Sequence, residues 1–190
     1  MVMDYQDFLS CLYVGARVVK HQPPHDESQD MNTRSIKGMN LAALLVCKVI
    51  HRCKDAKESK LLNLNSCSLI QVPNAVYFIL KANDISICNL SDNLITKISP
   101  ELVTCFSHIT TLNLSSNRLS SLPNELINCT HLQSVDISSN SFVVFPDILL
   151  EIESITEIIA NINFIADVNA EALEQHPQLE LINLEDCQTE

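Results

Sequence analysis

The chain has 190 residues, of which 46% are hydrophobic, and its formal net charge is -11 at pH 7. This length and hydrophobic content suit one domain with a substantial core, while the presence of only two glycines excludes the glycine-rich loops that bind nucleotides. Residues 61–190 carry three Lys/Arg against sixteen Asp/Glu, which argues against nucleic acid and anionic membranes as partners, since both require clustered cations.

Residues 1–38 are expected to form a flexible N-terminal extension. The stretch 20–38 is polar, contains two adjacent prolines and shows no hydrophobic periodicity, as linkers do. Asp4 and Asp7 stand where a secretory signal needs positive charge, and no apolar run approaches the roughly 18 residues of a membrane helix. We therefore expect a protein of the cytoplasm, with the nucleus as an alternative, that is not secreted.

Residues 39–58 are expected to form a capping helix on the repeats that follow. The segment lacks Pro and Gly, and one stripe of it is apolar, with the basic side chains elsewhere on the helix. The stripe consists of Leu41, Leu45, Val49 and Cys53, and the basic residues are Lys48, Arg52, Lys54 and Lys57. The alternative is a basic amphipathic helix that binds a membrane surface or a calmodulin-type partner.

From residue 59 to residue 190 the chain repeats itself about six times, the last copy being incomplete. The third copy reads "TLNLSSNRLSSLP" and the fourth "SVDISSNSFVVFP". The copies align on a position that holds Asn or Cys, and this position recurs at intervals of 26, 24, 23, 23 and 24 residues. It is occupied by Cys67, Asn93, Asn117, Asn140, Asn163 and Cys187.

The pattern L-x-x-L-x-L-x-x-N/C-x-L, matched six times in register, resembles the leucine-rich repeat family. The resemblance implies an α/β solenoid: a leucine-rich repeat array with a curved parallel β-sheet on the concave face, short helical or three-ten convex segments and an N-terminal capping helix. It also implies an intracellular scaffold, and it brings no catalytic motif.

Alternation along each strand separates structural residues from outward ones. Leu112 and Leu114 are expected to point into the core, while Asn113 points to the concave face. After the strand the chain turns toward the convex side, and an inward Asn117 amide supplies donors and an acceptor to unpaired backbone groups. The other members of the Asn/Cys row are expected to play the same structural part.

The cysteines are expected to be reduced, buried and hydrophobic in character. Cys67 and Cys187 fall in the Asn/Cys row, Cys88 on a strand, and Cys105 and Cys129 on adjacent convex segments. A disulfide between Cys105 and Cys129 is the alternative.

The convex segments are expected to begin with proline at the first helical position, as at Pro123 and Pro146. Apolar residues then recur at every third position, at Leu126, Cys129 and Leu132 and again at Leu149, Ile152 and Ile155. The fifth repeat has Asn169 in place of proline and is expected to pack differently.

The concave face is expected to carry three outward columns of small polar residues that become acidic and partly apolar in the last repeats. These side chains either hydrogen-bond along the sheet and stabilise it or bind a partner. If a partner binds there, the candidate contacts are Asp92, Asp136, Glu157, Ile159, Ile162 and Asp186.

No catalytic, metal or cofactor site is predicted. A glycine-flanked nucleophile is absent, and His108 and His131, expected to be neighbours on one edge, are too few ligands for zinc. We expect a non-catalytic scaffold or adaptor that binds a protein partner, one that carries a basic surface if the acidic residues make the contact. The alternative is a regulatory subunit or inhibitor whose acidic C-terminal repeats mask a basic site on an enzyme or histone-like protein.

Overall fold

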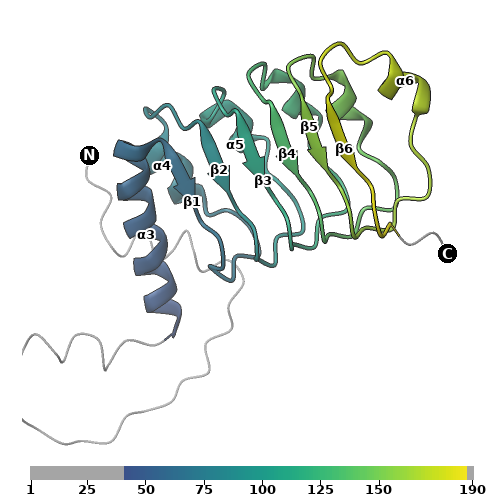
Figure 1. Ribbon diagram of the computed structural model, residues 1–190. Helices are drawn as coiled ribbons and strands as arrows, with labels where there is room; N and C mark the ends of the chain where they lie inside the picture. Colours follow the sequence, from purple (N-terminus) through teal and green to yellow (C-terminus); the bar gives the residue numbers. More distant parts are fainter. Residues whose placement is uncertain (1–40, 188–190) are drawn as a thin grey trace, which may run out of the picture.

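The computed structural model describes residues 41–187, so the expected extension 1–38 lies outside the described residues. Six short parallel strands lie side by side in chain order in one open sheet, and a helical segment follows each of the first five (Figure 1). This arrangement confirms the expected α/β solenoid. The elements are α3 (Leu41–Ser59), β1 (Leu61–Asn63), α4 (Asn74–Leu80), β2 (Ile87–Asn89), α5 (Glu101–Cys105), β3 (Thr111–Asn113), η1 (Asn124–Asn128), β4 (Ser134–Asp136), η2 (Asp147–Glu151), β5 (Glu157–Ile159), α6 (Ala170–Glu174) and β6 (Leu181–Asn183).

The core lies between the sheet and the helical segments. The middle residue of each strand points inward, and its register partners are the middle residues of the neighbouring strands, as for Cys88, Leu112 and Val135. The inward strand positions are completely or almost completely buried from β1 to β5, and Ile182 of β6 is partly buried. The alternation of the sequence therefore becomes a continuous apolar column through the solenoid.

The helical segments contribute the other wall of the core at the predicted spacing. Leu126, Cys129 and Leu132 after β3, and the three equivalent residues after β4, are each at most 2% exposed. Among the described residues, no helix is both long enough and apolar enough to span a membrane.

Each proline precedes its helical segment by one residue instead of occupying the first helical position. Pro123 precedes η1 and Pro146 precedes η2, and their carbonyls accept hydrogen bonds from Leu126 N at 3.1 Å and Leu149 N at 2.9 Å. In the fifth repeat Asn169 takes this position, and its side chain accepts a hydrogen bond from Ala172 N at 3.1 Å. Asparagine therefore replaces proline as a helix start by capping the helix.

Helix α3 packs against the β1 end of the sheet (Figure 1). Its buried stripe is Val46, Val49, Cys53 and Ala56, whereas Leu45 is only partly buried. The expected stripe was therefore wrong by one position at Leu45, and the side chain of Leu41 lies outside the described residues. Val46, Val49 and Cys53 follow the three- and four-residue spacing of a single helical face. Val46 therefore lies on the side of the helix that packs against the first repeat.

Two of the basic residues expected away from the first repeat instead contact it. Lys48 Nζ donates to Ser66 O at 2.7 Å, and Arg52 Nη1 donates to Asn65 O at 2.5 Å. Arg52 also lies 3.4 Å from Cys67 Sγ. Long aliphatic stems let both cations reach past the apolar contact. Arg52 supplies a donor to Asn65 O, whose equivalents in later repeats, Ser91 O, Ser115 O and Ser138 O, accept from an asparagine Nδ2.

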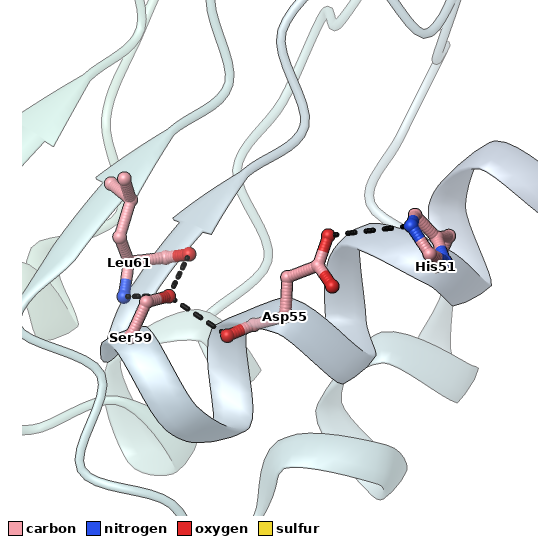
Figure 2. A network of polar contacts seen from close by, with 4 residues as sticks. All are labelled: His51, Asp55, Ser59 and Leu61. Carbon is pink, nitrogen blue, oxygen red and sulfur yellow. Dashed lines mark hydrogen bonds and ion pairs between the residues drawn. The ribbon is translucent and has the colours of Figure 1, made fainter.

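A compact joint connects α3 to β1 (Figure 2). Ser59 Oγ donates to Asp55 O at 2.8 Å and accepts from Leu61 N at 3.3 Å, while His51 Nε2 lies 3.8 Å from Asp55 Oδ2 on the exposed side of the helix. Lys60 has φ of 60° and ends the helix in a left-handed residue. The joint fixes the direction in which the first strand leaves the cap.

Candidate functional site

The outward side chains of the six strands, with the turn that follows each strand, form one continuous surface, here called the strand face. It includes the columns expected from the sequence and one further column at the first residue of each strand. The members of this further column are Leu61, Ile87, Thr111, Ser134, Glu157 and Leu181. Of these, only Glu157 was predicted as a candidate contact, although extending the alternation two residues back from Asn63 predicts the whole column.

The second column is polar in five of its six positions, and these side chains bond to the segment that directly follows their own strand. Asn113 Oδ1 accepts from Ser115 N at 2.9 Å and from Ser115 Oγ at 2.7 Å. Asp136 Oδ1 accepts from Ser138 N at 2.9 Å and from Ser138 Oγ at 2.6 Å. Asn63, Asn89 and Asn183 accept equivalent backbone bonds. The exception is Ile159, which places an apolar side chain in this polar row.

The turn column has a constrained backbone. Residues Ser66, Asp92, Ser116, Ser139, Ile162 and Asp186 all have φ between 52° and 56°. Asp is among the residue types that tolerate this left-handed conformation comparatively well, but a β-branched isoleucine there is a true outlier. Ile162 is nevertheless 51% exposed, so burial of its side chain does little to offset the energetic cost of its left-handed backbone.

The structure brings most of the candidate contacts together at β4, β5 and β6. Asp136 pairs in register with Ile159, and Glu157 pairs with Ser134, whose Oγ donates to Glu157 Oε2 at 2.6 Å. Ile162 N donates to Glu185 O at 3.0 Å, which places the Ile162 turn beside the turn that contains Asp186. Asp92 follows β2 and does not join this group.

The Asn row runs behind the strand face, inside the solenoid. Asn93, Asn117, Asn140 and Asn163 are 2–9% exposed. Asn117 Nδ2 donates to Leu90 O at 3.0 Å, Leu114 O at 3.0 Å and Ser115 O at 3.1 Å, and its Oδ1 accepts from Ile95 N at 3.0 Å. The other three asparagines make corresponding bonds. These amides hold the turn that presents the outward residues.

The C-terminal part of the strand face is acidic and partly apolar. The sequence has no Lys or Arg after Arg118. In residues 41–187 no carboxylate after Arg118 lies in an ion pair, because the two contacts of this kind, made by His51 and His108, precede it. Leu181, which pairs in register with Glu157, is 49% exposed.

The histidines expected to be neighbours are neighbours. The rings of His108 and His131 are 5.4 Å apart, and His108 Nδ1 lies 3.6 Å from Asp84 Oδ1. The described part of the chain contains no cluster of three or more His, Cys, Asp or Glu side chains suited to holding a metal ion.

The described cysteines are all free thiols. Cys67, Cys88 and Cys129 are buried, but Cys105 and Cys187 are only partly buried, so the expectation of burial was wrong for these two. Cys105 ends the short helix α5, and Cys187 lies in the last described turn, beyond β6. Burial raises the pKa of the Cys88 thiol to about 12 and that of Cys129 to about 11, so neither is an activated nucleophile.

Comparison with known proteins agrees with this geometry. The family model described as "Leucine rich repeat" matches residues 85–142. The leucine-rich repeat domain of the type III effector XopL is similar in structure, with a TM-score of 0.60 and 14% identity over 82% of this chain and 62% of that one. A Leptospira interrogans LRR protein, LIC12759, matches with a TM-score of 0.49 and 19% identity over 77% of this chain. This chain spans 62% and 46% of the lengths of these two chains. The described fold is an α/β leucine-rich repeat solenoid.

Proposed function

We propose that the protein is a non-catalytic intracellular scaffold that binds a protein partner on the strand face of β4, β5 and β6. One observation carries the proposal. In the second column and the turn column the side chains are polar from β1 to β4 and become apolar after β4, as Ile159 and the 51% exposed Ile162, among carboxylates that have no cation. Leucine-rich repeat solenoids generally use such extended surfaces for binding.

The center of the proposed contact is formed by Asp136, Glu157 and Ile159, which are adjacent on β4 and β5. Ile162 and Asp186 extend it along the following turns. Leu181 adds an exposed apolar side chain next to Glu157 in the sheet register. Asp92 stays a candidate for a separate contact nearer the cap.

A partner with a basic surface fits this face. Carboxylates without cations attract Lys and Arg and speed association, while the apolar side chains give the buried area that charge pairs alone lack. No cofactor, nucleic acid or membrane is required.

The second candidate function is that of a regulatory subunit or inhibitor whose acidic repeats mask a basic site on an enzyme or histone-like protein. The absence of Lys and Arg after Arg118 favors it. Ionic strength separates the two functions, because exposed charge pairing is screened by salt. Binding that persists at high salt supports the scaffold, and binding that salt abolishes supports the inhibitor.

A resemblance within the repeat proteins also supports an intracellular scaffold, placed in the cytoplasm with the nucleus as an alternative. Residues 39–187 are similar to the small animal protein called leucine-rich repeat-containing protein 20. The similarity lies in "LLNLNSCSLIQVP", "LNLSSNRLSSLPNEL" and "LELINLEDC".

Quantitative affinity capture with the full chain tests the proposal. We expect the Asp136→Lys and Asp186→Lys variants to lose the partners that the unmodified chain retains. Asp136→Asn keeps an acceptor for Ser138 and separates the loss of charge from the loss of that bond. Glu174→Lys makes the same charge reversal at an exposed residue of α6 and should retain the partners. Equal recovery by all four variants contradicts the strand-face site.

A further inference from the structure

A groove lies on the helical side of the solenoid, between η1 and η2. Its larger part is a cleft of about 570 Å³, and a second cleft of about 370 Å³ shares Ile127 and Glu151 with the first. The two clefts form one groove, here called the η groove, that runs from Ser120 to Gln178. Figure 1 shows that the helical segments and the outward strand face lie on opposite sides of the sheet.

Apolar side chains line the η groove and are accessible; they are here called its apolar floor. Val144 is 74% exposed and Ile127 is 41% exposed, and both line the larger cleft together with the partly buried Leu122 and Ile148. Single exposed apolar residues are ordinary on protein surfaces. Two exposed and two partly buried apolar side chains that line one cleft instead mark a place where another chain can be buried.

The apolar floor is not required by the core of the fourth repeat. Phe142 and Phe145 point inward and are 0% and 3% exposed, and the two residues between them, Val143 and Val144, point outward. In the third repeat the equivalent outward pair is formed by the serines at 120–121. The fourth repeat therefore exposes apolar side chains at positions that need none for folding.

Acidic side chains also line the η groove. Asp147 and Glu151 line the larger cleft, and Glu151 and Glu153 line the smaller one. No Lys or Arg lines either cleft. These carboxylates lie next to an apolar floor, where the lower dielectric strengthens their attraction for a cation.

We propose that the η groove is a second docking site, which binds a partner segment with one apolar side chain between Lys or Arg residues. The apolar side chain packs on Val144 and Ile127, and the flanking cations pair with Asp147, Glu151 and Glu153. The shape of the groove, its apolar floor and its uncompensated charge select this chemistry together. The site stands independently of the strand face, because no candidate strand-face residue lines it.

Synthetic peptides of about twelve residues test the inference on the full chain. Each peptide has a central Leu, Ile, Phe or Met flanked by Lys or Arg pairs in a Gly–Ser frame, and each is titrated while the methyl NMR signals of Ile127 and Val144 are followed. We expect these signals to shift, with weaker binding at higher salt. Peptides with Asp/Glu flanks or with a central Ser should leave the signals unchanged.

Two matched pairs of variants locate the contact. Val144→Ser should weaken binding about tenfold, the usual result of leaving one apolar side chain unburied, whereas Val143→Ser, at an equally apolar neighbor outside both clefts, should not. Glu151→Lys, at the end of η2, should abolish the salt-dependent part of binding. Glu174→Lys, at the end of α6, should not.

Four results would overturn the inference. The first is the absence of shifts for every basic peptide up to about 1 mM, a limit of about 4 kcal/mol of binding free energy. The second is binding that Asp136→Lys removes and Val144→Ser leaves intact, which would place the peptides on the strand face. The third is a shift that appears with rising protein concentration and no peptide, which assigns the groove to a second copy. The fourth is a shift caused by Arg17→Glu alone. Residues 17–20 read "RVVK", with two valines between cations, so this result would assign the groove to the chain's own residues 1–38.

Discussion

Four asparagines show how one side chain supports a whole turn of the solenoid. Each amide of Asn93, Asn117, Asn140 and Asn163 donates to carbonyls of its own turn and of the preceding repeat. Each Oδ1 accepts at least one backbone N–H of the preceding repeat. A hydrophobic residue could fill the space, but it would leave the buried N–H groups without their side-chain acceptor and would take one donor from each of the carbonyls.

Replacing Asn117 by alanine tests this role. Ile95 N would lose its side-chain acceptor inside the core, and Leu90 O and Leu114 O would each lose one of their two amide donors. We expect the free energy of unfolding to fall by about 3 kcal/mol. Urea denaturation measures the loss. Asn113→Ala removes an amide of the same size from the strand face and should cost less than about 1 kcal/mol. Equal costs for the two variants would contradict the structural role of the buried row.

At the scale of elements, the cap shows what a helical pattern predicts and what it leaves open. The apolar spacing predicts helix α3 and the end of the sheet that it covers, because a solenoid end must be buried. It does not predict the bonds of Lys48 and Arg52, since a pattern of faces ignores the reach of a long side chain. The same two cations are thereby engaged with the first repeat, as the bonds to Ser66 O and Asn65 O show.

Arg52→Ala is expected to weaken the cap. The change leaves Asn65 O with only the weak Cys67 Sγ donor and removes packing at the edge of α3, so we expect about 1–2 kcal/mol of destabilization by urea denaturation. Lys54→Ala, at an exposed position of the same helix, should change stability by less than about 0.5 kcal/mol. If the Lys54 variant loses as much as the Arg52 variant, the Arg52 bonds contribute nothing of their own.

For the whole molecule, the repeat period predicted the architecture better than it predicted the surfaces. A fixed period with inward leucines determines one strand and one helical segment per repeat, so the six strands and their register follow from counting. The strand-face column that begins at Leu61 was missed because counting began at the asparagines. The η groove was missed because it arises between two helical segments. Ile127 and Val144 belong to different repeats, and only the fold brings both to the lining of one cleft.

The buried thiols couple the stability of the whole core to pH. Burial raises the pKa of Cys53 and of Cys88 from 9.0 to about 12, and that of Cys129 from 9.0 to about 11. In the unfolded chain these thiols ionize near pH 9, whereas in the folded protein they stay protonated. The folded state therefore binds more protons above pH 9, and the stability that the neutral thiols contribute is present below pH 9 and declines above it.

We expect the contribution of these thiols to the free energy of unfolding to be independent of pH up to about pH 9. Above that pH it should fall by about 1.4 kcal/mol per pH unit for each of the three thiols, until their folded-state pKa values are reached. Urea denaturation at a series of pH values measures the slope.

Cys88→Ala should be less stable at neutral pH, because it leaves a cavity, and yet show a shallower alkaline slope, because one titrating thiol is gone. Cys47→Ala, at an exposed thiol, should keep the slope of the unmodified protein. An identical slope in the Cys88 and Cys47 variants would show that the alkaline loss arises elsewhere than in the buried thiols.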